Sequence, residues 1–140
     1  KEASEVSTGW DGVAGRAVDG NTDGSYWNLS VAHTNWQAQP WWQVDLGTPQ
    51  KLASVFLWNR TDCCSSRLAD VHVFASESPI TGTTVAQVRA LPGVTEKVLT
   101  GVQGRFTEVT GLGQARYLRI MLEGTNYLQL AEVQAFALSP

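Results

Sequence analysis

Short apolar stretches separated by turn residues are the sequence feature that most restricts the fold of this 140-residue chain. Apolar and polar residues alternate in them with the period of a strand, and helical periodicity is weak throughout. Turn sequences such as GTPQ from Gly47 and GLGQ from Gly111 separate these stretches. We expect strands over six ranges, Trp41–Leu46, Lys51–Asn59, Ala69–Ser76, Phe106–Val109, Ala115–Glu123 and Glu132–Leu138.

Many short strands without a long helix predict one all-β domain over residues 1–140, an antiparallel β-sandwich of the jelly-roll type. In the strand from Ala69, we expect Val71 and Val73 to face the core, with Asp70, His72 and Phe74 on the opposite face. The polar tract over residues 4–39 has few strand signals. Such a long irregular segment in a small domain is usually functional loop surface.

The charge balance of the chain argues against two classes of partner. Lys and Arg number 10 and Asp and Glu number 13, so the net charge of -3 gives no electrostatic reason to expect nucleic acid. No apolar run approaches the roughly 18 residues of a membrane span, so we expect no membrane insertion. The first residue is Lys1, with neither an initiating Met nor a signal peptide, which suggests a processed chain or an excised domain.

The only two cysteines, Cys63 and Cys64, are adjacent. Neighbouring Cα atoms are about 3.8 Å apart, which is short of the usual disulfide span of about 4.4–6.8 Å. A bridge here would stabilise the fold little, because it closes almost no loop, and would serve as a stiff, sulfur-faced surface. Two reduced, partly buried cysteines are an equally reasonable interpretation.

Polar residues of complementary chemistry surround the cysteines. Arg60 and Arg67 offer forked donors, and the neutral imidazole of His33 offers one donor and one acceptor. With Asp62 orienting an arginine, this set suits a small, neutral, polyhydroxylated ligand. The alternative for the arginines is ordinary surface ion pairing with Asp62 or Asp70.

These residues follow the pattern H-x26-R-x-D-x4-R, which resembles that of the F-type lectins, or fucolectins. The cysteine pair falls where that family carries a vicinal disulfide. The segments RAVDGNTDGSYW, AHTNWQ, QPWWQVDLG and LAEVQAF also resemble fucolectin sequences. More broadly the chain is similar to discoidin and coagulation-factor type C domains, which share a jelly-roll fold.

The resemblance implies a site for L-fucose. In it, His33, Arg60 and Arg67 would hydrogen-bond the axial 4-hydroxyl, the ring oxygen and the 3-hydroxyl of the sugar. The Cys63–Cys64 disulfide would pack on the C1–C2 edge.

Fucose also carries a methyl group, which needs an apolar pocket. Tyr26 and Trp27 are our candidates for it, although core or loop packing is an equal alternative for Trp27. Trp10 and Asp11 are candidates for additional contacts from the first loop, where the chain departs most from the family.

The segment DGNTDGSYWNLS, which begins at Asp19, offers several oxygen ligands of the kind that calcium prefers. Composition alone favours an Asx turn without an ion. The family binds a structural calcium here. By match, the ligands would be the Arg16 carbonyl, the Asp19 carboxylate, the Asn21 carbonyl, Ser30, the Ala131 carbonyl and the Glu132 carboxylate.

We therefore predict a calcium-containing, extracellular lectin domain that binds fucosylated glycans and is not an enzyme. Asp62 is the one acidic residue at the expected pocket, whereas a glycoside hydrolase needs two carboxylates. The alternatives are a discoidin-like domain that binds phospholipid or a protein, and a carbohydrate-binding appendage of a glycoside hydrolase. The sequence does not distinguish a free domain from a homo-oligomer or a fusion to other domains.

Overall fold

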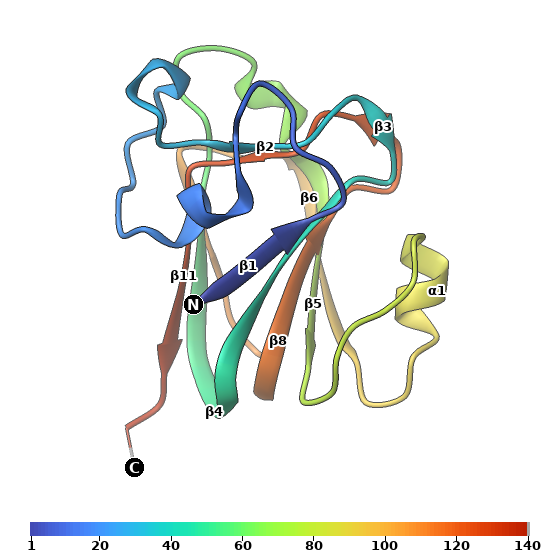
Figure 1. The fold of residues 1–140 in the computed structure, drawn as a ribbon. Helices are drawn as coiled ribbons and strands as arrows, with labels where there is room; N and C mark the ends of the chain where they lie inside the picture. Colours follow the sequence, from blue (N-terminus) through green and yellow to red (C-terminus); the bar gives the residue numbers. More distant parts are fainter. Residues whose placement is uncertain (140) are drawn as a thin grey trace.

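The computed structural model describes residues 1–139, whose strands form an antiparallel β-sandwich (Figure 1), which confirms the expected all-β fold. The strands are β1 Glu2–Glu5, β2 Ala32–His33, β3 Gln37–Ala38, β4 Trp41–Trp58, β5 Ala69–Ser76, β6 Thr95–Val102, β7 Phe106–Val109, β8 Gln114–Met121, β9 Thr125–Asn126, β10 Gln129–Leu130 and β11 Glu132–Ala137. The helical elements are α1 Val85–Arg89 and three 3-10 turns, η1 Ala14–Val18, η2 Tyr26–Asn28 and η3 Ser65–Arg67.

One strand, β4, contributes to both layers. Its first half pairs with β1 and β8, and its second half pairs with β11 and β7. The expected end of a strand at Leu46 is therefore wrong, because the chain continues through a pairing irregularity between Asp45 and Gln50. Gly47 (φ 94°) adopts the left-handed backbone conformation there, so the turn residues bend the strand without ending it.

The strand from Ala69 to Ser76 is confirmed, and Val71 and Val73 lie in the main core as expected. On the opposite face, Asp70 is exposed, but His72 and Phe74 are buried as well. Phe74 packs with Val88 of the short helix α1 in a second, smaller core. This helix was not predicted, because five residues carry too little periodicity to be recognised.

Two strands at the sheet edges, β1 and β6, were not expected. Most of their side chains are exposed or half-buried, so their sequences, EASE and TEKVLTGV, lack a regular apolar alternation. Backbone pairing with β4 and β5 defines them instead.

In the described part of the chain, no helix is long and apolar enough to cross a membrane.

The tract of residues 4–39 is mostly loop, and it gathers at one end of the sandwich (Figure 1). A two-residue ribbon anchors it, because β2 pairs with β10 and places His33 opposite Gln129. The loop that follows β4 reaches the same end.

Candidate functional site

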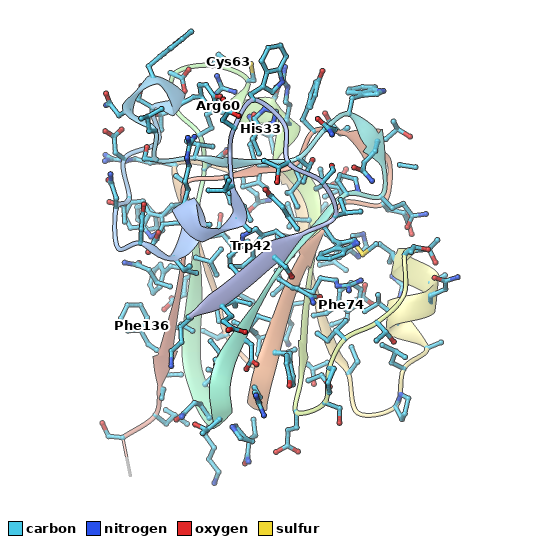
Figure 2. The ribbon with its side chains drawn as sticks, in the orientation of Figure 1. His33, Trp42, Arg60, Cys63, Phe74 and Phe136 are labelled. Carbon is cyan, nitrogen blue, oxygen red and sulfur yellow. A yellow bond between two sulfur atoms is a disulfide. The ribbon has the colours of Figure 1, made fainter. Side chains whose placement is uncertain are left out.

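Segments far apart in the sequence meet at this loop-rich end. His33, Arg60 and Cys63 lie together there, remote from Phe136 on β11 (Figure 2). Arg60 and the cysteines belong to the loop between β4 and η3, whereas His33 belongs to β2.

Buried Asn59 fixes the path of the loop after β4. Its side-chain Nδ2 donates to the carbonyls of Ser65 (3.0 Å) and Gln103 (3.2 Å), and its Oδ1 accepts from the backbone N–H of Arg60 (2.8 Å). Because this residue is only 1% exposed, these bonds form away from competing water. The buried side chain of Asn59 therefore fixes the conformation of this loop.

Asp62 orients Arg60 through a two-pronged ion pair. Arg60 Nε donates to Asp62 Oδ1 (2.9 Å) and Nη2 donates to Oδ2 (3.0 Å). These bonds lower the pKa of Asp62 to about 2, so the carboxylate stays ionised. Asp62 Oδ1 also accepts from the backbone N–H of Tyr26 (2.8 Å), whose ring centroid lies 4.9 Å from the Arg60 guanidinium carbon.

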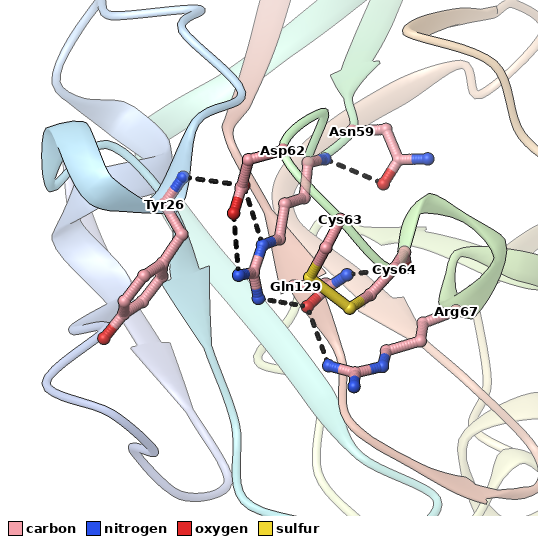
Figure 3. The surroundings of a disulfide bond; sticks show 8 residues. Tyr26, Asn59, Asp62, Cys63, Cys64, Arg67 and Gln129 are labelled. Carbon is pink, nitrogen blue, oxygen red and sulfur yellow. Dashed lines mark hydrogen bonds and ion pairs between the residues drawn. A yellow bond between two sulfur atoms is a disulfide. The ribbon is translucent and has the colours of Figure 1, made fainter.

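Gln129 joins the two arginines, and sequence reasoning missed it. Its Oε1 accepts from Arg60 Nη1 (3.2 Å) and from Arg67 Nη1 (3.3 Å), while its Nε2 donates to the Cys64 carbonyl (2.9 Å). Figure 3 shows the amide between the two guanidinium groups, beside the disulfide. Since Gln129 is 1% exposed and stands opposite His33 in the ribbon, it ties all these groups to the sheet.

The tautomer of buried His33 follows from its neighbour. Its Nδ1 lies 2.7 Å from the Thr34 carbonyl, so Nδ1 carries the proton and Nε2 is left as an acceptor. Burial lowers the pKa of His33, and the positive charges of Arg60 and Arg67 lower it further. The imidazole is therefore neutral at pH 7.

Cys63 and Cys64 form a vicinal disulfide, which decides between the two interpretations that the sequence left open. Cys63 is exposed, and Cys64 has a left-handed backbone (φ 61°) that turns the chain into η3. The Cys64 carbonyl accepts from the backbone N–H of Arg67 (3.0 Å) as well as from Gln129. The two sulfur atoms therefore belong to a surface that is rigidly tied to the arginines.

These groups lie around one cavity, whose volume is about 270 Å³. It is lined by Trp10, Tyr26, Trp27, His33, Arg60, Cys63, Cys64, Arg67 and Tyr127. Asp11, the other candidate from the first loop, is exposed and does not line it, and Asp62 acts from behind Arg60.

The aromatic wall of this cavity includes one residue that the pattern did not indicate. Tyr127 lies beneath the Arg67 guanidinium, whose carbon is 4.6 Å from the ring centroid. Trp27 (79% exposed) and Trp10 (68% exposed) form a rim, and the Tyr26 hydroxyl donates to the Trp10 carbonyl. Exposed aromatic faces next to a few fixed polar groups are typical of small-ligand sites.

The free hydrogen-bonding capacity of the cavity matches a polyol. Of the five N–H donors of a guanidinium, Arg60 uses three on Asp62 and Gln129, whereas Arg67 uses one on Gln129. Two donors remain on Arg60 and four on Arg67, beside the acceptor of His33. Such a site can bind hydroxyl and ring oxygens on one side of a small molecule and an apolar edge on the other.

A second group of residues surrounds Glu132, at the start of β11. Its Oε2 accepts from the backbone N–H of Gly20 (2.9 Å), but its buried Oε1 has no hydrogen-bond partner in the described chain. Burial, together with the nearby charge of Asp19, raises the pKa of Glu132 to about 7. A buried carboxylate oxygen without a partner, next to a second carboxylate, fits a cation.

The remaining members of the expected calcium set are Arg16, Asn21 and Ser30 of the N-terminal part and Ala131, directly before β11. Arg16 lies in η1, Asn21 donates its backbone N–H to Asp19 Oδ1 (2.9 Å), and Ser30 is buried. The Ala131 backbone N–H bonds to the Trp58 carbonyl (2.8 Å), which fixes the start of β11 beside β4. No cluster of three or more His, Cys, Asp or Glu suited to a metal occurs among residues 1–139, and the expected set contains only two acidic side chains.

Comparisons with known proteins agree with this geometry. The family model described as "NedA-like, galactose-binding domain" matches residues 16–109. Fucolectin-5 of Anguilla japonica is 35% identical over 129 residues, which are 91% of this chain and 66% of the eel protein. The chain thus spans about two thirds of that relative.

Solved structures resemble the whole chain. The lectin domain of lectinolysin in complex with Lewis B antigen superposes with a TM-score of 0.84 at 34% identity, covering 99% of this chain and 94% of that one. A Streptococcus pneumoniae fucose-binding module has a TM-score of 0.84 at 29% identity, covering 99% and 92%. A fucolectin from striped bass (Morone saxatilis) serum has a TM-score of 0.77 at 32% identity, covering 97% and 46%.

Proposed function

Because the chain belongs to the F-type lectin family of galactose-binding-like jelly-roll domains, we propose that it binds the terminal L-fucose of fucosylated glycans. The observation that carries the proposal is the pair of arginines held by Gln129 and Asp62 beside a neutral imidazole. The resemblance to the F-type lectin pattern implies that His33, Arg60 and Arg67 contact the sugar.

Each part of the cavity has a role in this proposal. Arg60 and Arg67 donate to sugar oxygens, and His33 Nε2 accepts a proton from one hydroxyl. The Cys63–Cys64 surface packs on an apolar edge of the ring, and the aromatic wall that includes Tyr26 and Trp27 surrounds the methyl group. The arginines are already held in place by protein groups, so little ordering is needed when the sugar binds.

The first test is a calorimetric titration of the protein with L-fucose and, separately, with D-galactose. We expect fucose to bind in the micromolar to millimolar range, because a single sugar offers few contacts. Galactose should bind at least about ten-fold more weakly, since its hydroxymethyl group would have to enter an apolar environment without a partner. Equal binding of both sugars, or none, would contradict the proposal.

The protonation of His33 predicts how fucose affinity depends on pH. Because the pKa of His33 lies below its ordinary value of 6.5, we expect the affinity to be constant from about pH 8 down to pH 6.5 and to fall only in more acidic solution. Protonation would turn the acceptor Nε2 into a donor. Titrations at several pH values would measure this, and an affinity that rises on acidification would show that His33 donates instead.

We further propose a structural calcium ion held by Asp19, Ser30 and Glu132 with the carbonyls of Arg16, Asn21 and Ala131. The unpartnered Oε1 of Glu132 supports this assignment, because an ion would satisfy it and compensate two neighbouring carboxylates. Glu132 lies 112 residues after Gly20, so the ion would join the last strand to the binding loops.

We propose a role in binding rather than catalysis. The residues that line the cavity in the described chain include no Asp or Glu, and Asp62 has a pKa of about 2, which does not suit a general acid. The relatives and solved structures that resemble this chain include lectins and binding modules. Turnover of a fucosylated chromogenic substrate would contradict this assignment.

We also propose that the domain is extracellular and is linked to other copies or domains. A disulfide and a calcium site together favour an extracellular location, in agreement with the serum origin of the striped bass fucolectin. The similar structure is the lectin domain of lectinolysin, which supports fusion to other domains as one arrangement for this chain. Several linked sites, by fusion or by oligomerisation, would strengthen weak binding to single sugars.

Phospholipid binding is a second candidate, favoured by the exposed side chains of Trp10 and Trp27 at one end of the molecule. The net charge of -3 does not favour anionic lipid. Co-sedimentation with liposomes, in the presence and absence of L-fucose, would distinguish the two functions.

A further inference from the structure

Four aromatic side chains form a continuous strip on the outer face of the sheet of β11, β4 and β7. This aromatic strip consists of Phe56, Trp58, Phe106 and Phe136. The ring centroid of Phe56 lies 6.2 Å from that of Phe106 and 5.8 Å from that of Phe136. Phe106 in turn lies 5.1 Å from Trp58. None of the four lines the cavity proposed for fucose (the fucose cavity), and Figure 2 shows Phe136 well apart from His33.

The core of the sandwich does not need the aromatic strip, because the opposite face of the same strands already forms it. Val55, Leu57 and Val109, which alternate with the strip residues along β4 and β7, belong to the main core. Phe106 is 54% exposed and Phe136 is 48% exposed. The solvent-facing side of an antiparallel sheet is ordinarily polar, so a contiguous apolar patch on it marks an interaction surface.

The one polar group within the strip is satisfied by the chain itself. Trp58 Nε1 donates to Gln134 Oε1 (2.8 Å), and phenylalanine side chains have no hydrogen-bonding group. The strip therefore gains free energy on binding chiefly by covering apolar surface, which favours another apolar protein surface as its partner.

Two opposite charges lie on either side of Phe106. Arg105 precedes it, with its guanidinium carbon 5.9 Å from the Trp58 ring centroid, and Glu108 stands opposite Phe56 in the pairing of β7 with β4. Arg105 and Glu108 are both exposed, and neither forms an ion pair in the described chain. An unpaired cation and an unpaired anion beside one apolar patch are complementary to the same patch turned by 180°.

We propose that the aromatic strip is a contact surface for a second copy of this chain, in a two-fold symmetric dimer. A two-fold axis that passes between Arg105 and Glu108 brings the arginine of each copy against the glutamate of the other, and the two Phe106 rings meet near the axis. Because no strip residue lines the fucose cavity, both cavities stay open, and the dimer presents two binding sites. Self-association itself does not depend on the proposed function.

The area of the strip predicts a weak dimer. A Phe or Trp side chain presents roughly 150–250 Å², and these four are about half exposed or less, so together they offer roughly 300 Å² per copy. A stable dimer buries about 800 Å² per copy. We therefore expect a dissociation constant of roughly 50–500 µM.

Sedimentation velocity of the 140-residue chain, from about 5 µM to about 1 mM, measures this equilibrium. Phe106→Ser and, independently, Phe136→Ser should each weaken the dimer by at least about ten-fold, because each removes an exposed ring from the contact. The matched control is Val98→Ser, which changes a 50% exposed apolar residue of β6, outside the strip, and should associate as the wild type does. Circular dichroism would establish that the variants are folded.

Charge reversal tests the two-fold arrangement. Arg105→Glu and Glu108→Arg should each weaken the dimer, because each places like charges together at both symmetric contacts. An equimolar mixture of these two variants should recover the association of the wild type. In the mixed dimer one copy offers two acidic residues and the other offers two basic residues, so both contacts are attractive again.

The outcomes distinguish this proposal from the fucose site. A wild type that stays monomeric up to about 1 mM, or one whose association survives both Phe106→Ser and Phe136→Ser, would overturn the strip as a contact between copies. A mixture that associates no better than its two components would overturn the two-fold arrangement. Saturating L-fucose should leave the dissociation constant unchanged, and absence of fucose binding would contradict the proposed function while leaving the dimer intact.

Discussion

Replacing Arg60 with alanine should weaken L-fucose binding by at least about 100-fold, which corresponds to nearly 3 kcal/mol. The substitution removes the two guanidinium donors that the protein leaves free for the proposed sugar, and it also leaves the groups that hold Arg60 without their partner. Asp62 loses both of its ion-pair bonds (2.9 and 3.0 Å), so its pKa should rise from about 2 toward its ordinary value. Gln129 loses one of its two guanidinium partners.

Titration calorimetry of two further variants separates the loss of donors from damage to the fold. Arg105→Ala removes an exposed arginine that lies 5.9 Å from the Trp58 ring and does not line the fucose cavity, so fucose affinity should stay unchanged. Asp62→Asn keeps the Arg60 donors but weakens their support, and it should cause a smaller loss than Arg60→Ala. If Arg60→Ala bound fucose like the wild type while remaining folded, the sugar would have to lie elsewhere.

The second large effect that we expect is an increase in the stability of the folded protein when calcium binds. In metal-free protein, the pKa of Glu132 is raised from 4.5 to about 7, so the folded state is penalised when this carboxylate ionises. The penalty is absent below pH 4.5, grows as the pH rises and is complete above about pH 7, where it amounts to about 3 kcal/mol. Calcium should remove it and raise the melting temperature by roughly 10 °C at pH 8.

Melting curves at pH 5 and pH 8, with calcium or with chelator, test this expectation. Glu132→Gln should stabilise the chelated protein at pH 8 and abolish the response to calcium, whereas Glu123→Gln, on an exposed residue, should retain it. Glu5 also has a pKa raised to about 7, mainly by burial, but its contribution is shared by the wild type and both variants. A wild type whose melting temperature at pH 8 is the same with calcium and with chelator would rule out the ion.

The parts of the fold that could be predicted from the sequence are those whose side chains alternate between core and surface. The ranges of β5 and β7 coincide with the expected ones. Edge strands β1 and β6 were not predicted, because backbone pairing defines them and their sequences carry little apolar alternation. The second core beneath α1 was not predicted either. Both faces of β5 are buried there, and an alternating pattern indicates only one buried face.

For the candidate site, the resemblance to the F-type lectin pattern pointed to His33, Arg60 and Arg67, and the structure brings all three to one cavity. Tyr127 and Gln129 could not be found in this way. Gln129 acts on Arg67 from 62 positions further along the chain. Its importance lies in being buried between two cations, which is a property of the packing and has no local signature.

The position of Gln129 has a consequence for anyone who wishes to redesign the domain. Its amide couples both arginines and the Cys64 carbonyl to a ribbon of the sheet, so these groups form one unit whose parts cannot be exchanged singly. The aromatic rim, represented by Trp10 and Trp27, is exposed and stands on loops outside that unit. A library randomised along the rim should therefore vary ligand preference without disturbing the Gln129-centred unit.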